Sequence, residues 1–246
     1  MTASQALYVY GVVAAGASTP GDVTGLRETP VELLEHDGIA AVVSAVDVER
    51  PLGKRADLLA HSRVLDAFAA RCAVVPIRFG SVLPDRSEVL AGLLEPGSAR
   101  FRELLDELSG RVQFNLRARY DEEVILAEVV RENPAVAKLR EQTRNQPEAA
   151  TYYSRMRLGE LVARAVARKR EAESQVVLDA LAPHSVAHSI RDGEGVDHLL
   201  DAAFLVETKQ QEPFEQAAEA TAASLHGRAR LRLVGPLAAY DFVTEE

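Results

Sequence analysis

Two histidines after a long helical segment have the spacing that comes nearest to a metal-dependent active site. His184 and His188 are four residues apart, and on one helix this spacing places both rings on the same face, as in zinc sites. Pro183 ends the helical pattern just before them, however, and neither a glutamate at the zincin position nor a third ligand stands nearby. We therefore assign no metal site. A small α+β metal-dependent hydrolase that uses the two histidines stays open as an alternative function.

The sequence also lacks the common motifs for nucleophilic catalysis and for cofactor binding. The chain has no Gly-x-Ser-x-Gly turn that could expose a nucleophile. His61 and Ser62 are neighbours on an amphipathic helical segment, where successive side chains point about 100° apart, so we expect them at the helix surface. Neither residues 16–25 nor residues 193–195 have the glycine spacing of a phosphate-binding loop. We therefore predict no catalytic residue and no cofactor.

One apolar run points to binding rather than to catalysis. Arg78 lies between Ile77 and Phe79, so its guanidinium group must either face water or find a polar partner. Pro76 cannot donate a hydrogen bond to a neighbouring strand, which predicts a sheet edge or a bulge at this position. An open edge can accept a strand from a partner protein. An internal ion pair and a protein-binding anchor are both open for Arg78.

A second candidate surface lies on the long helix. Tyr153, Arg157 and Glu160 follow one another at spacings of four and three residues, which places them on neighbouring turns. An ion pair between Arg157 and Glu160 would contribute only ~0.2–0.5 kcal/mol, so a solvated face and a partner-binding face are both compatible with the pattern. Gly159 in the same helix costs ~1 kcal/mol relative to alanine, and we expect a neighbouring element to pack closely over it.

Composition excludes several classes of protein. Acidic residues exceed basic residues by 37 to 28, giving a formal charge of -9, which argues against nucleic acid as a partner. The N-terminus does not read as a signal peptide, and no run approaches the ~20 apolar residues that span a bilayer. The single Cys72 excludes an internal disulfide. We predict a cytoplasmic protein that is not embedded in a membrane.

Periodicity and turn signals predict an α+β protein. The strands are expected over residues 7–14, 31–35, 39–46, 74–79, 112–120, 185–190, 199–207 and 228–234. The helices are expected over residues 55–71, 85–94, 99–108, 121–133, 134–144, 151–181 and 212–225.

These elements predict two small domains and a long helix in the second half. Each domain would be a mixed or antiparallel sheet with helices on one face, loosely ferredoxin-like. Residues 1–120 would form an N-terminal α+β domain, residues 121–150 a helical connector and residues 151–246 a C-terminal α+β domain.

Two turns are also expected from short motifs. Asp37 and Gly38 predict a β-hairpin. Gly235-Pro236 is expected to turn the chain, so that Tyr240 and Phe242 return onto the C-terminal domain and residues 231–243 close the fold.

Four motifs in a fixed order carry a resemblance to a known family. They are Tyr8-Val9-Tyr10-Gly11-Val12-Val13, Val74-Val75-Pro76-Ile77-Arg78-Phe79-Gly80, Tyr153-Ser154-Arg155-Met156-Arg157-Leu158-Gly159-Glu160 and Leu231-Arg232-Leu233-Val234-Gly235-Pro236-Leu237. With these motifs the chain resembles the gas vesicle accessory proteins F and L (GvpF/GvpL). The motifs do not distinguish the F subtype from the L subtype.

The resemblance implies a non-catalytic assembly factor for gas vesicles, the gas-filled flotation organelles of prokaryotes. Its partners would be the small hydrophobic shell protein, contacted during vesicle nucleation or growth, and other gas vesicle accessory proteins. The protein would lie in the cytoplasm in association with vesicles. The candidate protein-binding residues are Arg78, Phe79, Tyr153, Arg157 and Glu160. A ligand-sensing ferredoxin-like module is a third possible function.

Overall fold

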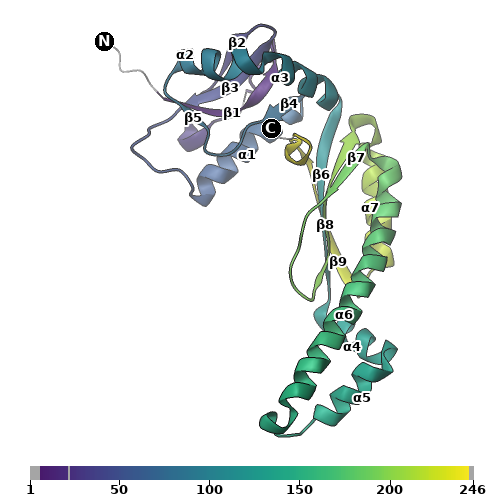
Figure 1. The fold of residues 1–246 in the computed structure, drawn as a ribbon. Coiled ribbons are helices and arrows are strands. Elements are labelled where there is room, and N and C mark those ends of the chain that lie inside the picture. The colour runs from purple at the N-terminus through teal and green to yellow at the C-terminus, as the bar shows by residue number, and fades with distance from the viewer. Residues whose placement is uncertain (1–5, 22, 244–246) are drawn as a thin grey trace. The chain divides into compact units, whose positions relative to one another are not determined.

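The computed structural model describes residues 6–21 and 23–243 and shows an α+β chain with two antiparallel sheets (Figure 1). Contacts within the chain divide it into two compact units. The first unit contains the chain up to Phe114, Leu205–Thr208 and the chain from Gly235 onward, and the second contains Asn115–Phe204 and Lys209–Val234. The α+β class, the two sheets and the long helix are confirmed. The division into domains at residues 120 and 150 stays a prediction.

The first sheet has the strand order β2-β3-β1-β4, with a short fifth strand that also pairs with β1. The strands are β1 (Leu7–Ala14), β2 (Val31–His36), β3 (Ile39–Ala45), β4 (Val74–Pro76) and β5 (Val82–Leu83). The hairpin between β2 and β3 is confirmed, because Asp37 and Gly38 both have positive φ angles, of 45° and 83°, as a type I′ turn requires.

Strand β1 is apolar on both faces of this sheet. The pairing of β1 with β3 shifts by one residue between Val9 and Gly11, which is a β-bulge. Val9 and Val12 pack in the cluster that contains α3 (Glu95–Leu108), whereas Tyr8 and Tyr10 pack in the cluster that contains α1 (Arg55–Ala69). The prediction of helices on one face is therefore wrong for this sheet. A strand buried on both faces needs cover on both sides.

Helix α1 buries a face that includes a histidine and leaves two of its leucines half exposed. Leu58 and Leu59 are 46% and 52% exposed. His61, Val64 and Phe68 are buried instead. The buried positions repeat every three or four residues, as an amphipathic helix requires, so the expectation of a surface position for His61 is wrong.

Two predicted boundaries next to β4 also differ from the structure. The strand expected over residues 74–79 ends at Pro76, which has no N–H group to continue the ladder. Helix α2 (Arg86–Glu88) continues through a π-helical turn (Val89–Leu94) directly into α3. The break expected at residues 96–98 is absent there, because Pro96 lies in the first turn of α3, where proline is tolerated.

The second sheet has the strand order β7-β8-β6-β9. Its strands are β6 (Arg111–Tyr120), β7 (Ala187–Ile190), β8 (His198–Glu207) and β9 (Ala229–Leu237), and the helices of this part of the chain are α4 (Glu122–Glu132), α5 (Pro134–Thr143), α6 (Glu148–Leu181) and α7 (Gln211–Ser224). Short 3-10 turns cover Leu26–Glu28, Ala182–His184, Thr208–Gln210 and Tyr240–Phe242.

Two predictions for the helices of this part of the chain are confirmed, namely the break before Pro134 and the long helix before Pro183. The centres of the Phe204 and Phe214 rings lie 5.3 Å apart, so α7 packs against β8 through these two side chains.

The C-terminal segment departs from its predicted path. Strand β9 runs through Gly235 and Pro236 to Leu237, so the turn predicted at these residues is wrong. A Cβ atom on Gly235 would collide with the ring of Phe114, which shows that the glycine permits close packing between strands. The segment after Leu237 belongs to the first unit and not to the C-terminal domain that we expected to receive it.

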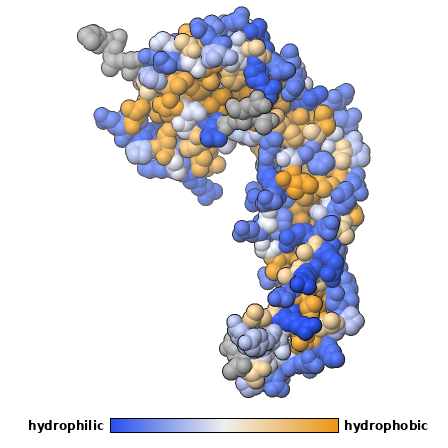
Figure 2. Space-filling model, in the orientation of Figure 1, coloured by the Kyte–Doolittle hydropathy of each residue, from blue (hydrophilic) through white to orange (hydrophobic). Residues whose placement is uncertain are grey.

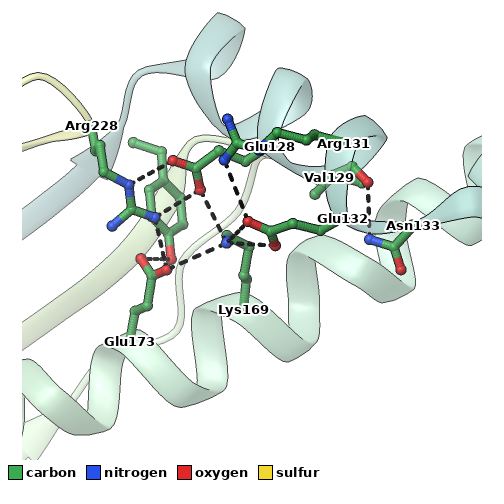
Figure 3. A network of polar contacts seen from close by, with 9 residues as sticks. Glu128, Val129, Arg131, Glu132, Asn133, Lys169, Glu173 and Arg228 are labelled. Carbon is green, nitrogen blue, oxygen red and sulfur yellow. Dashed lines mark hydrogen bonds and ion pairs between the residues drawn. The ribbon is translucent and has the colours of Figure 1, made fainter. Parts of the chain in front are cut away.

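A network of ion pairs joins α4, α6 and the turn before β9 in the second unit (Figure 3). The Arg228 guanidinium donates to both carboxylate oxygens of Glu128 on α4, at 2.7 and 2.8 Å, and to Glu173 on α6 at 2.9 Å. Lys169 Nζ lies 3.0 Å from Glu128 Oε2. The Tyr120 hydroxyl donates to Glu173 at 3.0 Å. The hydrogen bonds from Arg228 lower the pKa of Glu128 from 4.5 to about 2.

The network predicts an acid-sensitive contribution to stability. A carboxylate whose pKa is depressed by folding stabilises the folded state fully above its unfolded pKa, and this contribution is lost as the pH falls toward the folded value. The free energy of unfolding should therefore decrease between about pH 5 and pH 2. Glu128→Gln should cost on the order of 3 kcal/mol at pH 7 and flatten this part of the pH profile, as measured by urea unfolding. If the free energy of unfolding of Glu128→Gln falls with pH as steeply as that of the wild type, Glu128 is not the source of the acid sensitivity.

Gly159 on α6 is exposed, and apart from its two chain neighbours and the backbone of its own helix, no atom of the described residues lies within 4 Å of the position that a Cβ would occupy. The expectation that another element packs closely over this glycine is wrong. The residue therefore carries the conformational cost of a helical glycine without a packing contact that offsets it.

Gly159→Ala should raise the free energy of unfolding by about 0.5–1 kcal/mol and the melting temperature by about 1–4 °C. Gly11→Ala is the matched control, because its Cβ would lie 2.7 Å from the Val75 carbonyl oxygen and 2.8 Å from Leu65. That variant should lose stability. Thermal melts measure the melting temperatures of both variants. A lower melting temperature for Gly159→Ala than for the wild type would contradict the prediction that nothing packs over this glycine.

Candidate functional site

An open pocket of about 570 Å³ lies in the first unit beside the end of β4. We call it the β4 pocket. Three parts of the chain line it: Leu58, His61 and Ser62 on α1, Pro76 at the end of β4 with residues 77–79 after it, and Tyr240 with Val243 near the C-terminus. Figure 2 shows hydrophobic residues gathered over β1 and α1 on the visible face of this unit. The lining is mostly apolar, which is typical of sites that bind another molecule.

His61 is surrounded by four aromatic rings in the wall of this pocket. Its ring centre lies 5.7 Å from Tyr8, 5.8 Å from Tyr10, 5.6 Å from Phe79 and 6.2 Å from Tyr240. These rings come from β1, from the segment after β4 and from the C-terminal segment. The cluster therefore joins parts of the chain that are far apart in the sequence.

Hydrogen bonds fix the polar ends of the aromatic cluster. The Tyr8 hydroxyl lies 2.9 Å from His61 Nδ1 and accepts a hydrogen bond from the Gly80 amide at 3.1 Å. The Tyr10 hydroxyl lies 2.8 Å from Ser44 Oγ and accepts from the Leu26 amide at 2.6 Å.

Burial raises the pKa of Tyr8 to about 12 and lowers the pKa of His61 to about 4. Both side chains are therefore neutral at pH 7. Within the described part of the chain, the second ring nitrogen of His61, Nε2, has no hydrogen-bond partner.

The structure places Arg78 and Phe79 at this pocket. Arg78 is exposed in the loop that follows β4, and its carbonyl accepts hydrogen bonds from the amide and hydroxyl groups of Ser81. Phe79 is partly buried against the Tyr8 and His61 rings. The Phe79 ring supports the pocket wall, and Arg78 also lines the pocket. Their role in binding stays a prediction.

The other three candidates lie on α6 in the second unit. Tyr153, Arg157 and Glu160 are all exposed, and Tyr153 is 82% exposed. Its ring lies 5.5 Å from that of Tyr152. Among the contacts of the described residues there is no ion pair between Arg157 and Glu160, so that pairing is not formed. A binding role for this face of α6 also stays a prediction.

The two histidines with metal-like spacing do not share a helix. His184 ends a 3-10 turn, and His188 lies in β7 with its ring 5.9 Å from Phe204. Residues 6–21 and 23–243 contain no group of three or more His, Cys, Asp or Glu side chains placed to hold a metal ion. In the same residues, no helix is long and apolar enough to span a bilayer.

Sequence reasoning missed His61 and Tyr240 as members of the pocket. The helical phase of α1 could have indicated His61, because Val64 and Phe68 lie three and seven residues after it and mark the same face. Nothing local indicates Tyr240, because its position depends on where the C-terminal segment packs.

The fold and the motifs agree with a comparison with known proteins. Residues 6–244 match the family described as gas vesicle synthesis protein GvpL/GvpF. The chain belongs to this family. Gas vesicle protein F of Streptomyces sp. strain CB03234 is 35% identical over 241 residues, which cover 96% of this chain and 98% of the relative. Gas vesicle protein L of the same strain is 28% identical over 256 residues, which cover 98% of this chain and 94% of the relative.

The same family appears among solved structures. The crystal structure of GvpF from Anabaena sp. PCC7120 superposes with a TM-score of 0.85 at 26% identity, covering 99% of this chain and all of that one (100%). The crystal structure of GvpF from Microcystis aeruginosa gives a TM-score of 0.81 at 25% identity, covering 97% of this chain and 99% of that one. Membership of the GvpL/GvpF family gives the chain an accessory role in gas vesicles.

The C-terminal wall of the pocket should also stabilise the first unit. The Ala238 amide donates to Asp66 at 3.1 Å, the Asp241 amide donates to Gln113 at 3.0 Å, and Phe242 packs against the core. Truncation after Val234 should therefore lower the melting temperature by several degrees and promote aggregation, since burial of one aromatic side chain contributes about 1.5–3 kcal/mol. Calorimetry checks this. A truncated protein that melts like the full chain would show that the segment is dispensable.

Proposed function

We propose that this protein is a non-catalytic assembly factor that binds the small hydrophobic shell protein while gas vesicles nucleate or grow. The observation that carries the proposal is the open, apolar β4 pocket beside an edge strand, in a member of a gas vesicle synthesis family. The protein acts in the cytoplasm in association with vesicles. Its function requires an exposed apolar binding surface and no catalytic group.

The geometry of β4 supports pairing with a partner strand. The Ile77 amide donates to the Tyr10 carbonyl at 2.9 Å, and Val75 pairs with Val12. In an antiparallel ladder the main-chain groups of alternate residues face opposite sides, so those of Val74 and Pro76 face away from β1. Although all three residues of β4 are buried, β4 ends the strand order, and we propose that an extended segment aligns beside its outer edge.

The chemistry of the pocket suits a hydrophobic partner. A shell subunit rich in apolar residues is held in solution by a partner that covers part of its apolar surface. Leu58, Ile77 and Phe79 supply apolar contact area in the pocket. The net charge of -9 keeps the accessory protein itself soluble.

A second contact is proposed for other gas vesicle accessory proteins. Tyr152, Tyr153 and Met156 are 58%, 82% and 50% exposed near the start of α6, and Arg157 and Glu160 lie on the following turns. An exposed aromatic group with charged neighbours resembles the composition of protein interfaces. This face would bind a partner separately from the β4 pocket.

Arg78→Ala should reduce co-purification of the shell protein about three- to tenfold, because it removes a charged side chain from a residue that lines the pocket. Arg63→Ala on α1 is the control, since Arg63 is exposed in the same unit and does not line the pocket. Both variants should keep the wild-type melting temperature. If Arg78→Ala unfolds, or binds as the wild type does, Arg78 is not a binding anchor.

Deletion of the gene should abolish or sharply reduce vesicles without affecting growth in shaken culture. Flotation assays and electron microscopy of the deletion strain measure this, with the intact gene restored as the control. Normal vesicle numbers in a strain without a second copy of the gene would refute an essential role in assembly.

A further inference from the structure

The second sheet has a face that does not contact α6 or α7. The Tyr120 hydroxyl of β6 donates to Glu173 on α6, and Phe204 of β8 contacts Phe214 on α7. Alternate residues of a strand point to opposite faces of its sheet, so residues an odd number of positions away from Tyr120 or Phe204 lie on the other face. That other face carries Asn115, Arg117 and Arg119 of β6 and Asp201 of β8.

A small open pocket of about 190 Å³ lies on this other face, within the second unit. Its lining includes Arg117 on β6, Arg191 after β7 and Arg232 on β9, together with Asp201. Three guanidinium groups against one carboxylate leave two positive charges in excess around the pocket. The whole chain carries a formal charge of -9, so the charge of this surface is opposite in sign to that of the chain.

The carboxylates of the surface are already engaged by arginines. Arg117 Nε donates to Asp201 Oδ2 and Arg191 Nη1 donates to Asp201 Oδ1, both at 3.1 Å. Arg119 Nη1 donates to Asp197 Oδ1 at 3.2 Å. Two aspartates therefore serve three arginines, and each oxygen of Asp201 accepts from a different guanidinium group.

Two further arginines have no partner of their own. Arg230 and Arg232 are exposed on β9, and neither makes a hydrogen bond or an ion pair within residues 6–21 and 23–243. Strand β9 lies next to β6 in the sheet, and like charges on neighbouring strands repel each other. We use the name arginine face for the surface formed by Arg117, Arg119, Arg191, Arg230 and Arg232. This surface lacks part of its counter-charge.

We infer that the arginine face binds an extended acidic segment of a partner protein, two of whose carboxylates pair with Arg230 and Arg232. An extended chain advances about 3.3 Å per residue, so carboxylates at alternate positions lie about 6.6 Å apart. The same two-residue repeat separates Arg230 from Arg232 along β9. This surface is distinct from the β4 pocket, and the inference does not depend on binding of the shell protein there.

The chemistry of the arginine face favours an acidic peptide over other anions. A guanidinium group can donate two parallel N–H bonds to one carboxylate. Phosphates accept in the same way, but the charge of -9 repels a long nucleic acid backbone. Because β9 ends the strand order, a segment can lie along it without displacing another strand. Val234, 39% exposed beside the pocket, offers an apolar contact that a small anion cannot use.

The first test measures the binding of a fluorescent peptide to the full chain by fluorescence anisotropy. The probe alternates glutamate with threonine, and a matched peptide alternates glutamine with threonine. In about 20 mM salt the glutamate peptide should bind about tenfold more tightly than the glutamine peptide. Its binding should weaken as the salt rises to about 200 mM, because salt screens exposed charges. Equal binding of the two peptides, or no binding of either, would overturn the inference.

A pair of double variants locates the binding surface. Arg230→Gln with Arg232→Gln removes the two unpaired charges and should weaken binding of the glutamate peptide about three- to tenfold. Arg164→Gln with Arg168→Gln is the matched control, because both arginines are exposed on α6 in the same unit and the net charge changes equally. The control should bind as the wild type does, and both double variants should keep the wild-type melting temperature. Equal losses of binding in the two double variants would show that only the total charge matters, and would overturn the inference.

Two further measurements exclude other occupants of the arginine face. Inorganic phosphate and a single-stranded oligothymidylate should displace the glutamate peptide only weakly, and displacement by either at the concentration of unlabelled peptide that suffices would identify a general anion site instead. Sedimentation tests whether a second copy of this chain binds there. The double variant of Arg230 and Arg232 should leave the oligomeric state unchanged. A dimer of the wild type that this variant abolishes would make the second copy the occupant and overturn the inference.

Discussion

The first unit depends on one constraint, which is that strand β1 is buried on both faces while it carries two tyrosine hydroxyl groups. Tyr8 and Tyr10 are completely buried, and each hydroxyl must find hydrogen-bond partners inside the protein. Those partners are Gly80 and His61 for Tyr8, and Ser44 and Leu26 for Tyr10. Satisfying them positions α1, the segment after β4 and the turn at Leu26 around a single strand.

The same constraint produces the binding surface. Because Tyr8 draws His61 into the core, α1 turns Leu58 toward the pocket, where it stays half exposed. Because the Gly80 amide donates to Tyr8, the loop after β4 is held with Phe79 against the aromatic cluster. A core requirement of the fold thus creates an apolar pocket with a neutral histidine in its wall. The ion-pair network centred on Glu128 serves only the second unit.

Local signals were enough to predict much of the fold. The hairpin turn at Asp37 and the proline that separates α4 from α5 each act over a few residues, and each appears in the structure. The errors have two sources. The helix runs on through Pro96 because a π-helical turn directly precedes it, a local feature that the helical pattern does not reveal. The path of β9 depends on contact between Gly235 and Phe114, and no short window of sequence contains both residues.

The candidate site was predictable only in part. Arg78 and Phe79 could be selected because a charge and a proline interrupt an apolar run, and both lie at the pocket. His61 was assigned to the helix surface because it forms no catalytic pair with its neighbour Ser62, and that reasoning did not consider the buried face of α1 marked by Val64 and Phe68. Tyr240 could not be placed, because the C-terminal segment packs on the first unit through Asp66 and Gln113, which are distant in the sequence.

Hydrogen–deuterium exchange with and without bound shell protein tests the central claim most directly, because it maps the bound surface without a mutation. The account predicts slower exchange in residues 55–62 and 74–80, which border the β4 pocket, and in the segment around Tyr240. Exchange in β6 should stay unchanged. Protection confined to the start of α6, with no change around the β4 pocket, would contradict it.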